Sequence, residues 1–243
     1  MEDDTWNVLL NMKETDKDSK FTLVTSDEKE GSKLEILFVQ TSNMQRILGQ
    51  YPDIVNLDGT YCINNLGFPC YVFMVADGEG TGSVVAYALV KDETTTTLTS
   101  LLKEFNDLNP NVKIKTFIVD KDAAEIAAIK AVFPDTNIIL CRFHVSNNFK
   151  DANSKYSKNC SAQDKDNNLK SLKRMLTTTV EDTFYKSLNT LTHELQIYIR
   201  KNWLPILDSW ARDKAKHILT ELEVKIWSLN LGPFRNMSSL FFG

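Results

Sequence analysis

The hydrophobic and polar positions of the first fifty residues predict a hairpin between two helices. Two apolar runs, FTLVT at 21–25 and LEILFVQ at 34–40, are separated by a polar connector that contains Gly31. Apolar runs joined by a short glycine-containing link are typical of a β-hairpin. A helical pattern around Trp6 precedes the hairpin, and the segment 41–52 has helical periodicity and stop signals at its end. We therefore expect residues 1–50 to form a lead-in of helix, hairpin and helix.

Three further apolar runs follow in quick succession, at 54–63, 70–77 and 83–90. The links between them are only a few residues long, whereas a parallel crossover needs about a dozen or more. The three strands are therefore predicted to form an antiparallel meander. The glycine-rich stretch at 77–82 lies in one of these links rather than between a strand and a helix, so it does not predict a site for a nucleotide cofactor.

The pattern then alternates between helix and strand. The predicted elements are a helix at 94–108, a strand at 113–120, a helix at 123–133 and a strand at 137–143. Strand–helix–strand units imply parallel pairing with right-handed crossovers. Together with the meander, they predict an α/β core at 51–146 in which helices flank one mixed five-stranded sheet.

The strand pattern disappears after about residue 146, and residues 166–230 have helical periodicity that Pro205 interrupts. We therefore expect a C-terminal all-helical region over 147–243.

The charge is distributed unevenly along the chain. The whole chain has a net charge of −4, so its composition alone does not indicate a nucleic-acid binder. Residues 1–35 carry a net charge of −5, whereas residues 146–174 carry a net charge of +4, with seven Lys and Arg between Lys150 and Arg174. The basic segment is either a solvated face of a helix or a local anion-binding surface.

Four cysteines in 243 residues are too few for a disulfide framework. Cys62, Cys70 and Cys141 lie in apolar runs and are predicted to be buried thiols, which favours a reducing compartment, the nucleus or the cytoplasm. The acidic N-terminus lacks the basic region of a secretory signal. No apolar run in the sequence has the length needed to cross a bilayer. We therefore expect a protein that is not secreted and does not insert into a membrane.

Two aspartates occur in or directly after apolar strands, where aspartate is uncommon. Asp58 lies within IVNLDGTYCI, and Asp120 ends TFIVD. Carboxylates at a sheet edge can hold Mg²⁺, and a pair of such ions can support phosphoryl transfer. Two other interpretations remain open, because Asp58-Gly59 also fits a two-residue hairpin turn and Asp120 also fits an ordinary strand end. Asp122, by contrast, is predicted to cap the following helix with Glu125 as its capping-box partner.

The motifs LDGTY, TFIVDKDAAEIAAIKAVFP and LCRFHV occur in this order, within the longer strings ILFVQTSNMQRILGQYPDIVNLDGTY and FPDTNIILCRFHV. Taken together they resemble Mutator-like (MULE) transposases and, more closely, the RNase H-like domain of zinc finger SWIM domain-containing proteins of the type 1 and type 3 group. The resemblance covers residues 34–150 well. It implies an RNase H-like sheet with strand order 3-2-1-4-5, in which the strands of Asp58 and Asp120 are neighbours.

The resemblance also implies an Asp-Asp-Glu (DDE) site that uses Mg²⁺, with Asp58 and Asp120 as the first two acids and as metal ligands. Cys141 and His144 match the Cys-x-x-His motif of the family, and the role of this motif here is open. The motif supplies only two of the four ligands that structural zinc requires, so zinc is not expected in this chain.

The third acid has no match in the sequence. The family places a glutamate in a context similar to Asn-Asn-x-x-Glu, and no such string occurs beyond residue 170. Glu221 and Glu223 are the late candidates, but their context fits the surface of an amphipathic helix better. The Cys-x-Cys…Cys-x-His pattern of a SWIM zinc finger is also missing from the sequence, so we expect a truncated member of the family.

These features lead to two functional hypotheses. The first is a transposase-derived RNase H-like domain that binds DNA through the lysine-bearing 150–174 region and, because its acidic triad is incomplete, has little or no nuclease activity. The alternative is a non-enzymatic nuclear module that binds other proteins. Phosphate contacts make affinity fall steeply with salt, so salt dependence distinguishes the two.

Overall fold

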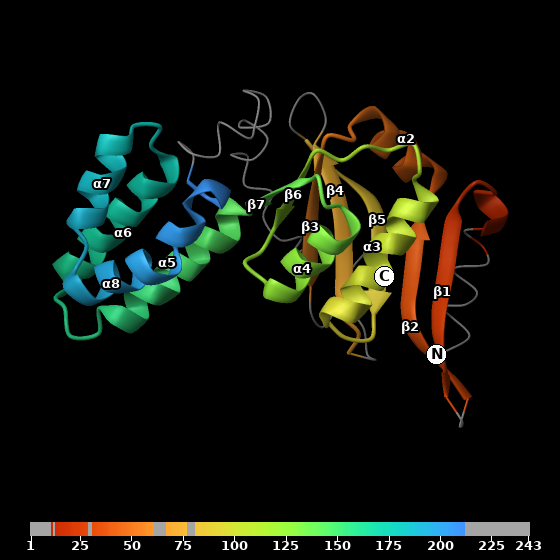
Figure 1. Ribbon diagram of the computed structural model, residues 1–243, viewed down its shortest axis with the longest axis horizontal. Helices are drawn as coiled ribbons and strands as arrows, with labels where there is room; N and C mark the ends of the chain where they lie inside the picture. Colours follow the sequence, from red (N-terminus) through yellow and green to blue (C-terminus); the bar gives the residue numbers. More distant parts are fainter. Residues whose placement is uncertain (1–10, 12, 29–30, 61–66, 77–80, 212–243) are drawn as a thin grey trace. The chain divides into compact units, whose positions relative to one another are not determined.

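The computed structural model describes residues 11, 13–28, 31–60, 67–76 and 81–211. Seven strands form one sheet: β1 (Lys20–Glu28), β2 (Gly31–Gln40), β3 (Ile54–Thr60), β4 (Cys70–Ala76), β5 (Gly82–Val90), β6 (Thr116–Val119) and β7 (Asn137–Leu140). Their order across the sheet is β1-β2-β5-β4-β3-β6-β7 (Figure 1). The last five strands of this order reproduce the predicted order 3-2-1-4-5, and the predicted antiparallel meander of β3, β4 and β5 is confirmed.

The predicted strand number was too low, because the N-terminal hairpin belongs to the sheet. β2 pairs with β5 in antiparallel register, with Ile36 opposite Val90 and Val39 opposite Tyr87. Four successive β2 residues, from Ile36 to Val39, are buried on alternating faces. A continuous apolar run of this kind is typical of a strand buried on both faces, so LEILFVQ already carried the signal for an interior strand.

The two faces of the sheet are covered by different helices. Successive side chains of β4 point to opposite faces, and all seven are buried. On one face, Phe73 stacks on Phe105 with ring centroids 4.3 Å apart, and α3 (Thr95–Leu108) lies beside α4 (Ala123–Val132) there (Figure 1). On the other face, Met44 of α2 (Ser42–Gln50) packs on a cluster that includes Val72. The sheet therefore has a helix-covered core on both sides.

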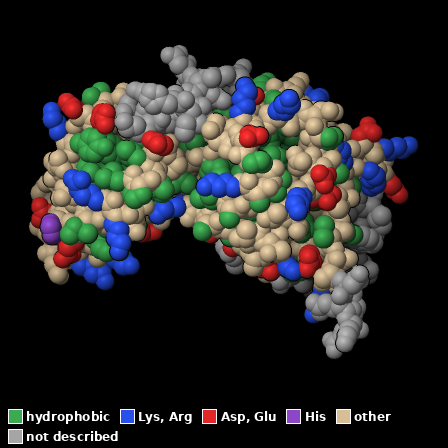
Figure 2. Space-filling model, in the orientation of Figure 1, with side chains coloured by type: hydrophobic (Ala, Val, Ile, Leu, Met, Phe, Trp, Pro, Cys, Tyr) green, Lys and Arg blue, Asp and Glu red, His purple; other side chains and the backbone are tan. Residues whose placement is uncertain are grey.

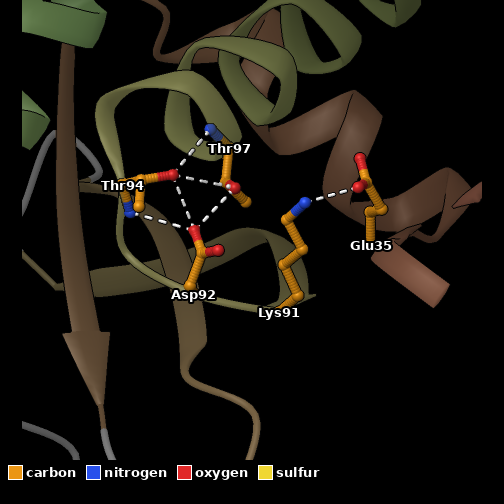
Figure 3. A network of polar contacts seen from close by, with 5 residues as sticks. All are labelled: Glu35, Lys91, Asp92, Thr94 and Thr97. Atoms are coloured by element: carbon orange, nitrogen blue, oxygen red, sulfur yellow. Dashed lines mark hydrogen bonds and ion pairs between the residues drawn. The ribbon is translucent and has the colours of Figure 1, made fainter. Parts of the chain in front are cut away.

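Helix α3 begins with a network of polar contacts (Figure 3). Thr94 caps the helix, and its hydroxyl accepts a hydrogen bond from the backbone N–H of Thr97 at 3.3 Å. The carboxylate of Asp92 accepts hydrogen bonds from the hydroxyls of Thr94 and Thr97, each at 2.7 Å. The neighbouring Lys91 forms an ion pair with Glu35 of β2. These contacts fix the segment between β5 and α3.

By its contacts the chain divides into two compact units. Among the described residues, the first contains those up to 117 and 122–136, and the second contains 118–121 and 137–211 and is mainly helical. The predicted helical region is confirmed in the described residues, and the break at Pro205 falls at a short 3₁₀ helix. Trp203 and Trp210 are fully buried, and the indole N–H of Trp210 donates to the carbonyl of Trp203 at 2.9 Å. In the described part of this unit the helices are α5 (Arg142–Tyr156), α6 (Ala162–Thr177), α7 (Glu181–Asn189), α8 (His193–Asn202) and the 3₁₀ helix η1 (Leu204–Ser209).

Among the residues that the structure describes, no helix is both long enough and apolar enough to span a membrane.

Candidate functional site

Asp58 lies within a strand and not in a turn. In the β3–β4 ladder Asp58 is opposite Val72, Gly59 is opposite Tyr71, and pairing continues to the end of β3. The hairpin-turn interpretation of Asp58-Gly59 is therefore wrong, because both residues pair with the neighbouring strand. Residues directly opposite each other share a face of the sheet, so Asp58 belongs to the face of Val72 and Gly59 to the face of Tyr71.

Gly59 leaves room for the ring of Tyr71. A Cβ atom on Gly59 would lie 3.1 Å from Cζ of Tyr71 and 3.2 Å from Oε1 of Glu93. Glycine in a strand often marks a close approach of this kind. The ring of Tyr71 can therefore cross the backbone of β3 and bring its hydroxyl to the segment after β5.

The hydroxyl of Tyr71 donates a hydrogen bond to Oε1 of Glu93 at 3.1 Å. Tyr71 is buried, and its pKa is raised first by this burial and then by the negative charges of Glu125, Asp122 and Asp58. The hydroxyl therefore stays protonated at neutral pH and acts as a donor to the carboxylate.

The acids around Tyr71 come from β3, from the segment after β5 and from the start of α4. Burial, followed by the charge of Asp122, raises the pKa of Glu93. Asp122 caps α4 as predicted, because its carboxylate accepts the backbone N–H of Glu125 at 2.9 Å. Glu125, predicted as the partner in a capping box, has a residue exposure of only 3%. This cluster of negative charge favours cations and repels a phosphate backbone.

Asp120, which directly follows β6, has a protein donor at each carboxylate oxygen. Oδ1 accepts the backbone N–H of Lys121 at 2.6 Å, and Oδ2 lies 3.3 Å from Nδ1 of His144. Burial alone would raise the pKa of Asp120. The hydrogen bond to His144, the N–H of Lys121 and the charge of His144 outweigh burial, so the pKa of Asp120 is lowered.

The Cys-x-x-His motif sits at the beginning of α5. Cys141 is the N-cap residue, and its backbone N–H donates to the carbonyl of Val119 at 2.7 Å. His144 is the third residue of the helix, and from there its ring reaches Asp120. The thiols of Cys141 and Cys70 are buried, as predicted, and burial raises the pKa of Cys70 to about 12. The prediction for Cys62 lies outside the described residues.

Asp58 lies in β3, and Asp120 directly follows β6. These two strands are neighbours in the sheet, as predicted. Asp58 and Asp120 belong to different compact units, and the convergence of their carboxylates stays a prediction. The late candidates Glu221 and Glu223 lie outside the described residues.

Both carboxylate oxygens of Asp120 face nitrogen donors. A histidine nitrogen faces Oδ2 and a backbone N–H faces Oδ1, which leaves one lone pair on each oxygen for a hard cation such as Mg²⁺. In the described part of the chain, no group of three or more His, Cys, Asp or Glu side chains is arranged to hold a metal ion. The Mg²⁺ site at Asp58 and Asp120 that the resemblance implies stays a prediction.

A sequence model of one family, the RNase H-like domain of zinc finger SWIM domain-containing protein 1/3, matches residues 11–139, more than half of the chain. The chain belongs to this family. The match covers β1 to β6 and the first three residues of β7, and with the strand order it identifies the sheet as an RNase H-like core.

Two other similarities are narrower than the family match. A PKS-NRPS hybrid synthetase, cheA, of Chaetomium globosum is 35% identical over 101 residues, which are 40% of this chain and 2% of that protein. The catalytic core domain of BIV integrase covers 57% of this chain and 97% of its own, with 11% identity and a TM-score of 0.27. A TM-score this low does not establish a shared fold. The assignment of this ZSWIM-type domain therefore depends on the family match and the strand order.

The sequence did not reveal the contact between Tyr71 and Glu93 or the burial of Glu125. One signal was available, since a glycine within a strand favours an aromatic neighbour across the ladder. Tyr71 occupies that position opposite Gly59. The register of β3 and β4, however, is set by tertiary pairing and could not be read from either strand alone.

Proposed function

We propose that this RNase H-like domain binds DNA through the lysine-bearing segment 150–174 of its helical unit. The observation that carries the proposal is the exposure of the basic side chains there. Six of the seven are exposed, and Lys165 is partly buried; the exposed ones are Lys150, Lys155, Lys158, Lys170, Lys173 and Arg174. In Figure 2, Lys and Arg side chains gather along the lower edge of the helical part.

Part of this charge is neutralised within the segment. Lys170 forms an ion pair with Asp166 one helical turn away, with Nζ and Oδ2 2.6 Å apart. Asp151 and Asp164 are exposed as well. The net charge of residues 146–174 is still +4, so a phosphate backbone at this surface meets an excess of cations. Exposed lysines contribute to affinity mainly by releasing counterions from DNA.

A salt titration tests the proposal. Anisotropy of a labelled DNA duplex would be measured with the full chain between about 50 and 200 mM salt. If Lys158, Lys170 and Lys173 contact phosphates, changing all three to Gln should reduce the slope of log K against log salt by about 2.7.

The matched control changes Lys103, Lys113 and Lys130 to Gln, because these lysines are exposed on the sheet-bearing unit. It removes the same charge and should leave the slope unchanged. Equal losses in both triple variants would mean that the net charge of the protein matters and that segment 150–174 does not. In that case the proposed surface would be wrong.

We further propose that the domain cleaves DNA poorly or not at all. Two observations support this. The ring of His144 lies against Oδ2 of Asp120, and the sequence beyond residue 170 lacks the Asn-Asn-x-x-Glu context of the third acid. Supercoiled plasmid would be incubated with the purified chain and Mn²⁺ and analysed for nicks. Efficient nicking that the Asp58→Asn variant abolishes would contradict the proposal.

A second candidate function is a non-enzymatic nuclear module that binds proteins. It is favoured by exposed hydrophobic side chains on the helical unit, among them Val180 at 55% and Ile197 at 52% exposure. Scattered apolar residues are normal on a surface, so these two favour a partner only if binding depends on them. Binding that is insensitive to salt and is lost in Ile197→Ser would favour this module. Nuclear residence is part of both candidates and is tested by imaging a tagged full chain.

A further inference from the structure

The Cys-x-x-His motif has a geometric explanation in this chain. The backbone N–H of Cys141 is fixed to Val119, the residue directly before Asp120. Helix α5 starts at the next residue, so a side chain three positions after Cys141 returns to the end of β6 after less than one turn. That side chain is His144, and its Nδ1 lies 3.3 Å from Oδ2 of Asp120. The spacing of the motif is therefore the spacing needed to bring a ring to this carboxylate.

The other side of the Asp120 carboxylate is fixed by Lys121. Its backbone N–H donates to Oδ1, while its side chain points to a different element. Nζ of Lys121 donates to the carbonyl of Asn202 at 3.2 Å and lies 4.5 Å from the ring centre of Trp203. Trp203 is fully buried in the helical unit, so the side chain of Lys121 lies against the core of that unit. Asp120 is thus held between the start of α5 and the end of α8.

We propose that His144 is a positioning residue that holds the Asp120 carboxylate and occupies the place of a divalent cation at Oδ2. The N–H on Nδ1 uses one of the two lone pairs of Oδ2 and places a donor proton beside it, and this proton repels a cation, so an ion binds Oδ2 more tightly when the imidazole moves away. In this chain the motif is thus a carboxylate clamp, and it reduces the affinity of Asp120 for metal. The clamp does not depend on whether the domain binds DNA.

Binding of Mn²⁺ by the full chain, measured by electron paramagnetic resonance, tests the clamp. The variant His144→Ala removes the ring and should bind Mn²⁺ about three- to tenfold more tightly than the unaltered chain, the range that one hydrogen bond supplies. In His144→Ala combined with Asp120→Asn, this gain should disappear. His193→Ala, which removes an exposed histidine on α8, should leave Mn²⁺ binding unchanged. The clamp is overturned if His144→Ala binds no more tightly, or if the gain persists without the Asp120 carboxylate.

A second measurement uses the unaltered chain and so does not depend on how a variant folds. Long-range ¹H–¹⁵N NMR of the ring distinguishes the two neutral tautomers of a histidine above its ordinary pKa of about 6.5. The clamp requires the proton on Nδ1 of His144, because Nδ1 must donate to Oδ2. A proton on Nε2 with Nδ1 bare would overturn it.

Discussion

Tyr71 crosses the backbone of Gly59, and a single added carbon at residue 59 would come within 3.1 Å of its ring. The two residues are direct partners in the β3–β4 ladder. This contact explains why a glycine follows Asp58 inside a buried strand, where glycine normally weakens the sheet. Gly59 leaves room for the aromatic ring, whose hydroxyl reaches Glu93.

Gly59→Ala should therefore destabilise the domain. The new methyl group would have to displace a buried ring, and overpacking of this kind costs about 1–3 kcal/mol. Urea unfolding followed by circular dichroism measures the loss. The control is Gly49→Ala in helix α2, where a Cβ atom has no neighbour within 4 Å among the described residues. An alanine there should stabilise the helix by about 0.5–1 kcal/mol. Equal stability of Gly59→Ala and the unaltered chain would contradict the close approach.

The strands and the antiparallel meander could be predicted from local periodicity and short links, whereas the order of the five core strands was implied by the family resemblance. The meander of β3, β4 and β5 is a direct consequence of connectors too short for a crossover. The placement of Asp58 within a strand was one of two open interpretations. It was decided by pairing with β4, which places residues on both sides of Asp58-Gly59 in the same ladder.

The parts that the sequence did not predict depend on which segments meet in space. The N-terminal hairpin joins the sheet because β2 pairs with β5, about fifty residues further along the chain. Glu93 meets Tyr71 for a similar reason, since one follows β5 and the other lies in β4. His144 was recognised as part of a motif, but its contact with Asp120 needed the position of α5. Local patterns determine elements, whereas these contacts are set by how the elements pack.

Asp92 should stabilise the start of α3 in a pH-dependent manner. Its pKa is lowered chiefly by the hydrogen bond from the Thr97 hydroxyl, which together with those from Thr94 outweighs partial burial (Figure 3). A carboxyl group whose pKa is lower in the folded state stabilises the fold above its unfolded pKa of about 3.9. That contribution is lost as the pH falls through the folded pKa. Thermal unfolding from pH 7 to pH 3 should therefore show a smaller drop in Asp92→Asn than in the unaltered chain.

The control for Asp92 is Asp107→Asn, which changes an exposed aspartate near the end of the same helix. It should leave the pH profile unchanged. If Asp92→Asn and Asp107→Asn flatten the profile equally, the network at the helix start is not the cause.

The neighbouring Glu93 should have the opposite effect. Its pKa is raised by burial and by the charge of Asp122. Between the unfolded and the folded pKa the native state binds more protons, so stability falls as the pH rises through this window. Ionised Glu93 therefore destabilises the fold at neutral pH. Glu93→Gln, which keeps an acceptor for Tyr71, should raise the unfolding temperature at pH 7 and make little difference at pH 3.5. A lower unfolding temperature of Glu93→Gln at pH 7 would contradict this sign.

The helical unit contains a buried network centred on Asn168. Its Nδ2 lies 3.0 Å from oxygens of Asn153, Ser157 and Thr192. Its Oδ1 accepts the backbone N–H of Thr192, the residue before α8, at 3.0 Å. Asn168 is only 1% exposed. One amide therefore joins α5, α6 and the start of α8, and such networks are strong only while every member is satisfied.

Asn168→Ala should destabilise the helical unit by about 2–4 kcal/mol, because it leaves several buried polar groups without a partner. Urea unfolding followed by tryptophan fluorescence measures this, since Trp203 and Trp210 are buried in the same unit. Asn167→Ala is the matched control, as Asn167 precedes Asn168 on α6 and is exposed. It should change stability by less than about 0.5 kcal/mol. If the two variants unfold at the same urea concentration, the amide of Asn168 does not hold the three helices together.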